Sequence, residues 1–128
     1  MNQEVLQKME NESGYFHHNQ YHIEEITEES VTLKANINEN SLNPYGIAHG
    51  GFIFGLGDTA MGILAREENK EVLTLNANID FLRPGSGKEL IAKSEMIKNG
   101  KKIKVLKANI YNEEGKLIAS MTSNYMVI

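Results

Sequence analysis

The longest apolar segment of the chain runs from Gly46 to Ala65, and its pattern predicts a helix. From about Gly51 to Glu68 the apolar residues show no strict alternation, and the run is too long for an ordinary strand. It ends in a polar group that starts at Arg66. Because such a helix is apolar on nearly every side, we expect other elements to wrap it.

The segments around this helix are predicted to be strands. The runs at Val31 and Leu90 show the alternation of apolar and polar residues that half-buried strands have, and the run at Val72 is rich in strand-forming residues. One predicted strand, Val31 to Ile37, comes before the helix. Four follow it: Val72 to Leu82, Leu90 to Ile97, Ile103 to Tyr111 and Leu117 to Val127. Between two of these, Asn99-Gly100 predicts a two-residue hairpin of type I′. The pattern predicts an α+β fold, in which one strand, a long helix and four successive antiparallel strands form a sheet curled around the helix.

Length and composition fit a single domain over residues 1–128. The chain has no cysteine, which excludes disulfides and thiolate metal sites and is consistent with a cytoplasmic location. Its net charge of -4 argues against nucleic acid as a partner. The polar segment Met1 to Glu12 reads as neither a signal nor a transit peptide, and it carries a weak helical stripe.

A carboxylate, Asp58, lies inside the apolar run, and a membrane span is one interpretation of that run. The twenty residues from Gly46 to Ala65 contain GxxxG spacings, as associating membrane helices do. However, His49 and Asp58 both lie inside the window, and an aspartate costs about 2.5 to 3.5 kcal/mol at the centre of a span. We therefore expect no membrane-spanning helix.

A dinucleotide-binding turn is a second interpretation, because residues 55–60 fit GxGxxA and Asp80 follows about 20 residues later. The strand that should precede the motif would contain the adjacent glycines Gly50 and Gly51. A doubly wound fold also needs further helices, whereas the sequence after Lys70 offers hairpins. The pattern therefore disfavours this interpretation.

A catalytic acid on a wrapped helix is the third interpretation. His49-Gly50-Gly51 would form the loop that ends at the helix N-terminus, where unpaired N–H groups can bind a developing oxyanion. Asp58 would lie two turns further on, where an unpartnered carboxylate costs several kcal/mol. A purely structural Asp58 that caps a neighbouring strand or loop stays open at this point.

Two short motifs in this region, NPYGIAHGG at residues 43–51 and LGDTA at 56–60, resemble the signature of hotdog-fold acyl-CoA thioesterases. The most similar group is the phenylacetate-degradation (PaaI-like) type. The resemblance extends from about Ser30 to the C-terminus and includes FLRP at residues 81–84. Residues 1–30 lie outside it and are expected to form a variable N-terminal cap.

The resemblance implies a curved antiparallel β-sheet wrapped around one long central α-helix. It also implies a homodimer or homotetramer with active sites shared between subunits. The expected reaction is hydrolysis of the thioester bond of small or medium acyl- or aryl-CoA to free acid and CoA. No metal or cofactor is expected, because CoA is part of the substrate.

Four residues take catalytic roles by this resemblance. Asp58 is the nucleophile on the thioester carbonyl or the general base for water, and the N–H of Gly50 polarises that carbonyl. Asn43 orients substrate or water, and Thr74 holds the attacking water. One loop and one helix would thus supply both the oxyanion donor and the base that thioester hydrolysis needs.

Six further positions are expected to contact substrate. His49 and Gly51 belong to the loop motif, and His49 is expected to brace the loop rather than act as a base. Arg83 and Pro84 would lie near the CoA phosphates, and the forked donors of Arg83 suit a phosphate. Lys98 and Lys101 flank the Asn99-Gly100 turn and could join them, although a solvated hairpin explains these lysines equally well.

Three alternatives remain on the sequence alone. A non-catalytic acyl-CoA-binding sensor would share the fold, and a hotdog hydratase or dehydratase would use His49 in place of Asp58. A metal site at His17, His18 and His22 is a weak possibility, since His18 and His22 would share a face if this segment were helical. The same histidines could instead touch substrate.

Overall fold

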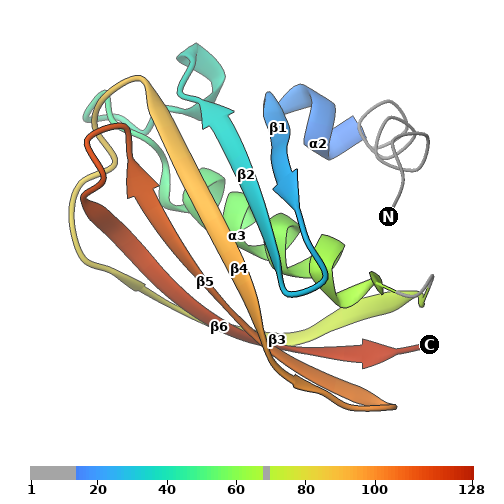
Figure 1. The fold of residues 1–128 in the computed structure, drawn as a ribbon. Coiled ribbons are helices and arrows are strands. Elements are labelled where there is room, and N and C mark those ends of the chain that lie inside the picture. Colours follow the sequence, from blue (N-terminus) through green and yellow to red (C-terminus); the bar gives the residue numbers. More distant parts are fainter. Residues whose placement is uncertain (1–13, 68–69) are drawn as a thin grey trace.

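The computed structural model describes residues 14–67 and 70–128, and it consists of one curved sheet around one long helix (Figure 1). The helices are α2 (Gly14–His18), the 3-10 turn η1 (Glu39–Ser41) and α3 (Gly50–Ala65). The strands are β1 (Tyr21–Ile26), β2 (Ser30–Asn36), β3 (Val72–Phe81), β4 (Glu89–Asn99), β5 (Ile103–Asn112) and β6 (Leu117–Val127). The predicted α+β architecture, an antiparallel sheet wrapped around a central helix, is confirmed.

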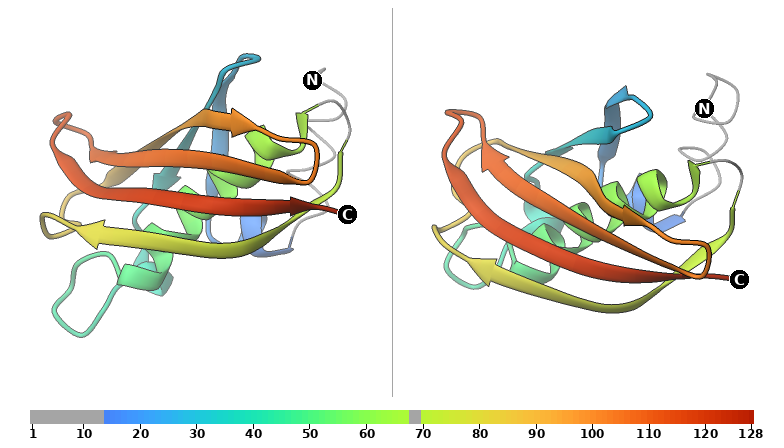
Figure 2. Two further views of the ribbon diagram at one scale, coloured as in Figure 1. Left: turned by 90° about the horizontal axis from the view of Figure 1, so that it is seen from below. Right: turned by 60° about the horizontal axis from the view of Figure 1, so that its bottom comes forward.

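The order of strands differs from the prediction in two respects. Two strands precede α3, because β1 joins the sheet beside β2 although its exposed polar residues hide the alternation. The order is β1-β2-β4-β5-β6-β3, so β3 pairs with β6 at the far edge and not with β4 (Figure 2). The expectation of four successive strands therefore holds only for β4, β5 and β6. Because β1 lies within residues 1–30, part of the predicted cap is a strand of the sheet.

The turn between β4 and β5 is not the predicted type I′ hairpin. Such a turn needs positive φ at both central residues, and neither Asn99 nor Gly100 has one. The last paired residues are Asn99 and Lys104, which leaves four residues in the loop. A Cβ on Gly100 would collide with the carbonyl oxygen of Ile103. This glycine is thus required by a close backbone approach and not by a left-handed conformation.

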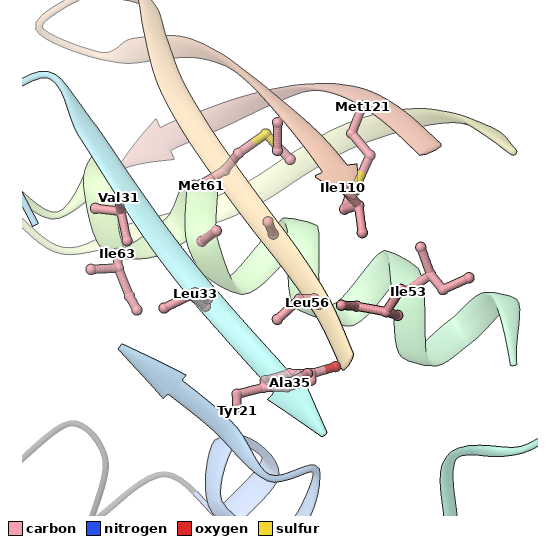
Figure 3. Close-up of a cluster of buried hydrophobic side chains, with 14 of the residues drawn as sticks. Tyr21, Val31, Leu33, Ala35, Ile53, Leu56, Met61, Ile63, Ile110 and Met121 are labelled. Atoms are coloured by element: carbon pink, nitrogen blue, oxygen red, sulfur yellow. The ribbon is translucent and has the colours of Figure 1, made fainter. Parts of the chain in front are cut away.

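Helix α3 buries most of its surface against the sheet. Leu56 and Met61 of the helix share one buried cluster with residues of the sheet such as Leu33 and Met121 (Figure 3). Its bounds are Gly50–Ala65, and the start agrees with the prediction. The helix ends at Ala65, with Arg66 as its C-cap, before the predicted end at Glu68, which itself lies outside the described residues. The expected wrapping is confirmed for this face of the helix.

One stripe of α3 remains uncovered within the described part of the chain. Its members are the only residues of the helix that are not buried: Gly50, Gly51, Phe54, Asp58, Thr59 and Gly62. These positions follow one another at spacings of three or four residues, or lie beside such a position, so they share one side of the helix. Asp58 therefore lies half-buried on the open face and not among the core side chains.

Two further predictions, a helix near the N-terminus and the absence of a membrane-spanning helix, have separate outcomes. The weak helical stripe expected in Met1 to Glu12 lies outside the described residues. Among residues 14–67 and 70–128, no helix is long and apolar enough to cross a membrane.

Candidate active site

The carboxylate of Asp58 is held by hydroxyl groups from two neighbouring strands. Thr74 on β3 donates to Oδ1 over 2.9 Å, and Tyr125 on β6 donates to the same oxygen over 2.7 Å. The Tyr125 hydroxyl also lies 2.8 Å from the main-chain oxygen of Asp58. Thr74 and Tyr125 face each other in the β3–β6 ladder, which places both hydroxyls at the helix. The sheet register thus builds a cradle for one carboxylate oxygen.

The two oxygens of this carboxylate have different environments. Oδ1 accepts both hydroxyls, whereas Oδ2 forms no hydrogen bond with any residue that the structure describes. A carboxylate held by one oxygen keeps a fixed orientation while the other oxygen can accept a proton or attack a carbon. The sequence-predicted pair Asp58 and Thr74 is therefore brought together in a geometry that allows such chemistry.

Tyr125 is a site residue that the sequence did not reveal. It is buried with 2% of its surface exposed, and burial, followed by the negative charge of Asp58 and its hydrogen bond, raises the pKa of Tyr125 well above the ordinary value of 10.0. The tyrosine consequently stays protonated and donates to Asp58 at neutral pH. Its inward alternation with Met121 and Ser123 was a signal that it faces the helix, but only the β3–β6 register shows which residue it meets.

A second group of predicted residues lies at the N-terminal end of α3. A cavity of about 410 Å³ is lined there by Asn43, Ile47, Ala48, Gly50, Ile53, Phe81, Leu82, Arg83, Pro84 and Gly85. The structure thus brings Asn43, Gly50, Arg83 and Pro84 together around one cavity. Nη1 of Arg83 donates to the carbonyl oxygen of Leu117 over 2.8 Å, which anchors the guanidinium at the rim while other N–H groups remain available.

The loop before α3 is shaped by Asn43. Its Oδ1 accepts the N–H groups of Tyr45 at 2.9 Å and Ile47 at 3.3 Å, which closes a turn over Asn43–Ile47. Gly46 has a φ of 81°, a conformation that favours glycine at this position of the motif. The Nδ2 group of Asn43 donates to none of the described residues, so it can still donate to a ligand in the cavity.

The first two N–H groups of α3 have different partners. Nδ1 of His49 accepts the N–H of Gly51 over 2.8 Å, so the histidine caps the helix and occupies that donor. The N–H of Gly50, by contrast, bonds to no other described residue. Of the two glycines predicted to face substrate, Gly50 therefore keeps a free donor, and the N–H of Gly51 is already used.

Gly50 and Asp58 of one chain are too far apart to act on one carbonyl group. Asp58 follows Gly50 by eight residues of regular helix, which corresponds to about 12 Å along the axis. A reacting carbonyl must lie about 3 Å from both the oxyanion donor and the attacking group. One chain thus carries two separate half-sites, which we call the Asp58 half-site (Asp58, Thr74, Tyr125) and the Gly50 half-site (Asn43, Gly50, Arg83, Pro84).

The predicted lysines lie away from the Gly50 half-site. Lys98 lies near the end of β4 and Lys101 in the turn that follows, where the N–H of Val127 bonds to the oxygen of Lys102. The N–H of Arg83 bonds instead to Ile118, at the other end of β6. Nine residues of strand correspond to about 30 Å, so one chain does not place these lysines on the cavity that Arg83 lines.

The histidine group does not form the predicted helical face. His17 and His18 end α2, whereas His22 lies on β1, so His18 and His22 are not neighbours on one helix. Within the part of the chain that the structure describes, no three side chains of the metal-binding kinds come together.

Comparison with known proteins identifies the family. The model of the Thioesterase superfamily matches residues 45–119, which is more than half of the chain and includes Gly50, Asp58, Thr74 and Arg83. The chain belongs to this superfamily. Its curved sheet around one helix is the hotdog fold of that group.

Two relatives from Escherichia coli are named as thioesterases. The medium/long-chain acyl-CoA thioesterase YigI is 32% identical over 97 residues, which cover 63% of this chain and 63% of YigI. The chain thus spans less than two thirds of the length of that relative. The acyl-coenzyme A thioesterase PaaI is 34% identical over 79 residues, covering 61% and 56% of the two chains. The solved PaaI structure superposes with a TM-score of 0.90 at 24% identity, covering 95% of this chain and 89% of PaaI, which shows the shared fold.

A third similar protein is a hypothetical thioesterase protein from Streptococcus pneumoniae. Its solved structure has a TM-score of 0.79 and 30% identity, and the match covers 84% of this chain and 89% of that one. One solved structure of it carries alanine in place of an aspartate, and another carries alanine in place of a threonine.

Proposed function

We propose that this protein is an acyl-CoA thioesterase that hydrolyses small or medium acyl- or aryl-CoA to the free acid and CoA. The observation that carries the proposal is the Asp58 half-site, in which Thr74 and Tyr125 fix one carboxylate oxygen and leave the other open. Such a carboxylate is suited to attack on a thioester or to activation of water.

The relatives support this activity. YigI and PaaI are both named as acyl-CoA thioesterases. In the Streptococcus pneumoniae protein, the replaced aspartate and threonine lie 16 residues apart, and Asp58 and Thr74 have the same separation here. The equal spacing supports a shared role for this Asp–Thr pair.

Two routes are open to Asp58 in the proposed reaction. As a general base, Oδ2 takes a proton from water while the water oxygen adds to the carbonyl carbon; the C–S bond then breaks and the proton passes to the CoA thiolate. As a nucleophile, Oδ2 itself adds, CoA leaves, and water hydrolyses the resulting anhydride. In both routes the N–H of Gly50 stabilises the negative oxygen of the tetrahedral intermediate. No metal or other cofactor takes part, because CoA enters with the substrate.

The separation of the half-sites leads us to propose that two subunits form each active site. The Gly50 half-site of one subunit would meet the Asp58 half-site of the other. Strand β3 offers a surface for such pairing, since it lies at the edge of the sheet and exposes Leu73 (56%) and Leu75 (48%). A homodimer is the smallest assembly that completes the site, and a homotetramer would be a pair of such dimers.

In this arrangement we assign substrate-binding roles to residues around the cavity. Asn43 orients the thioester or water through its free Nδ2 group, and Arg83 lies where it can bind a CoA phosphate. His49 holds the loop. Lys98 and Lys101 would contribute only if a second subunit brought their turn to the nucleotide. We place the reaction in the cytoplasm, in keeping with the absence of cysteine.

The test is an assay of thioester hydrolysis with acyl-CoAs of 2 to 16 carbons and phenylacetyl-CoA, on wild type and Asp58→Asn. We expect wild type to release CoA and Asp58→Asn to lose about 1,000-fold or more in kcat, because the amide can neither accept the proton nor attack. Glu28→Gln, at an exposed carboxylate in the loop between β1 and β2, is the control and should keep full activity. Binding without turnover by wild type would instead favour the acyl-CoA sensor, and hydration of enoyl-CoA would favour the hydratase.

A further inference from the structure

On the open side of α3, one position is nevertheless buried. Gly51, Asp58 and Gly62 are at least partly exposed, whereas Gly55 is buried although it lies between Gly51 and Asp58 on the same side. Gly55 has no side chain of its own, so the atoms that cover it must come from another element. They fill the space directly beside the reacting carboxylate, since residues three apart on a helix are neighbours.

Two tyrosine hydroxyls from the N-terminal part of the chain occupy this space. A Cβ built on Gly55 would collide with the hydroxyl of Tyr15 and would lie 2.8 Å from that of Tyr21. The two rings meet edge to face, with centroids 5.8 Å apart. Burial, followed by Tyr15 through its hydrogen bond and its charge and then the charge of Asp58, raises the pKa of Tyr21. The hydroxyl pair therefore lies within electrostatic reach of the Asp58 carboxylate.

The two tyrosines are held very differently. Tyr21 is 2% exposed, donates to the carbonyl oxygen of Phe52 over 2.9 Å and packs on the Phe52 ring with centroids 5.5 Å apart. Tyr15 is 53% exposed and belongs to the five-residue helix α2, whose buried anchor is the next residue, Phe16. Tyr21 is thus part of the core, whereas the ring of Tyr15 can be changed without removing a core side chain.

We infer that Tyr15 is a specificity-determining residue, whose ring limits how far an acyl group can extend along the open face of α3. An acyl group whose carbonyl carbon meets Oδ2 of Asp58 can extend over the glycine floor toward Gly55, where it meets Tyr15. Toward the other end of the helix the ring of Tyr125 lies against Gly62, with a Cβ at that glycine 3.8 Å from the ring, and this buried ring is fixed by Asp58. The ring of Tyr15 therefore limits the length of the acyl chain that can bind. The inference rests on the proposed thioesterase activity.

The experiment compares kcat/KM for straight-chain acyl-CoAs of 4 to 14 carbons in wild type, Tyr15→Phe and Tyr15→Ala. Removing the ring opens the space over Gly55, so Tyr15→Ala should prefer longer acyl groups. Its kcat/KM should rise about fourfold for each methylene group that becomes buried. Tyr15→Phe lacks only the hydroxyl and should shift the preference by no more than one methylene group. Ile97→Ala, an exposed side chain on β4 far from α2, is the control and should keep the wild-type profile.

The profile separates specificity from stability. A purely structural role for Tyr15 would lower kcat/KM for all chain lengths by the same factor, which would overturn the inference, as would an unchanged profile in Tyr15→Ala. Far-UV circular dichroism and the Tm show whether each variant is folded. If Tyr15→Ala is not folded, Tyr15→Leu carries the same test, because it also removes the ring but keeps an apolar side chain. If wild type hydrolyses no acyl-CoA, the proposed function fails and this inference fails with it. If wild type is active and the profile does not move, only the inference fails.

Discussion

The two ends of α3 are completed in opposite ways. At the C-terminal end, the N–H of Arg66 bonds to the oxygens of Gly62 and Ile63, and the ammonium of Lys104 donates to the oxygen of Ala65 over 2.9 Å. Lys104 is only 3% exposed, so this end is closed by a buried cation that also complements the helix dipole. At the N-terminal end, Nδ1 of His49 accepts the N–H of Gly51. The N–H of Gly50 bonds to no other described residue, and Gly50 lines a cavity.

This difference separates stability from function along one helix. A lysine that satisfies a buried carbonyl contributes to the free energy of folding, and at 3% exposure it is closed off from a ligand. A free N–H at the positive end of a helix contributes little to folding, but it can bind an oxyanion. Changes at the open end should therefore alter catalysis, and changes at the closed end should alter stability.

Among changes at the two ends of α3, the largest effect is expected from Gly50→Pro, which deletes the free N–H. Gly50 is the first residue of α3, a position where proline suits a helix, and the extended conformation of His49 (φ -63°, ψ 142°) is the one favoured before proline. We expect kcat to fall about 100- to 1,000-fold, as with loss of one oxyanion donor.

Gly50→Ala is the matched control for that change. It adds the same Cβ, which meets Cζ of Phe81 at 3.2 Å, but keeps the N–H. If both variants lose kcat equally, contact with Phe81 and not the lost donor explains the effect. The melting temperature of each variant should stay close to that of wild type.

A smaller effect, on stability alone, is expected from Lys104→Met at the closed end. Methionine keeps the length of the side chain but cannot donate to Ala65, so the free energy of unfolding should fall by about 1 to 3 kcal/mol. Urea denaturation measures this change, and kcat of the folded enzyme should not change. Lys107→Met, on the same strand but 48% exposed and paired with Glu95 at 3.4 Å, should cost under about 0.5 kcal/mol. An equal loss in the two variants would mean that the buried cap has no special role.

The smallest effect concerns Tyr125, which lies between the two ends, and it appears only at alkaline pH. The folded state raises the pKa of Tyr125, so the native protein keeps a proton that the unfolded chain releases above the ordinary pKa of 10.0. The stability from this tyrosine is complete below pH 10 and falls above it, by up to about 1.4 kcal/mol per pH unit. Urea midpoints at pH 9, 10 and 11 should decline less steeply for Tyr125→Phe than for wild type. Tyr45→Phe, with Tyr45 88% exposed, should decline like wild type, and parallel curves for all three proteins would refute the assignment.

Periodicity was enough to predict the elements from residue 30 onward. A long apolar run without alternation is a helix, and the period-two runs after it are strands, because these patterns report which side of each element is buried. They do not report which strands are neighbours. The position of β3 beside β6 and the strand β1, whose polar residues face solvent, therefore came only from the structure.

The candidate site was predicted in part for the same reason. The motif identified Asp58, and the resemblance placed Thr74 near it, which the 2.9 Å hydrogen bond confirms. Tyr125 was missed because its contact with Asp58 depends on the pairing of β3 with β6, two strands far apart in the sequence. The grouping of Lys98 and Lys101 with Arg83 is not found within one chain, because residue types alone do not tell which end of the sheet a turn occupies.

The central claim is that each active site combines Gly50 of one subunit with Asp58 of another, and complementation tests it directly. Gly50→Pro and Asp58→Asn, each inactive alone, are coexpressed with different affinity tags, and the mixed dimer is isolated. In a two-fold dimer one site of the mixed species lacks both groups and the other is intact, so activity should return to about half of the wild-type value per dimer. A mixed dimer as inactive as its two parents would contradict the account, because each site would then lie within a single subunit.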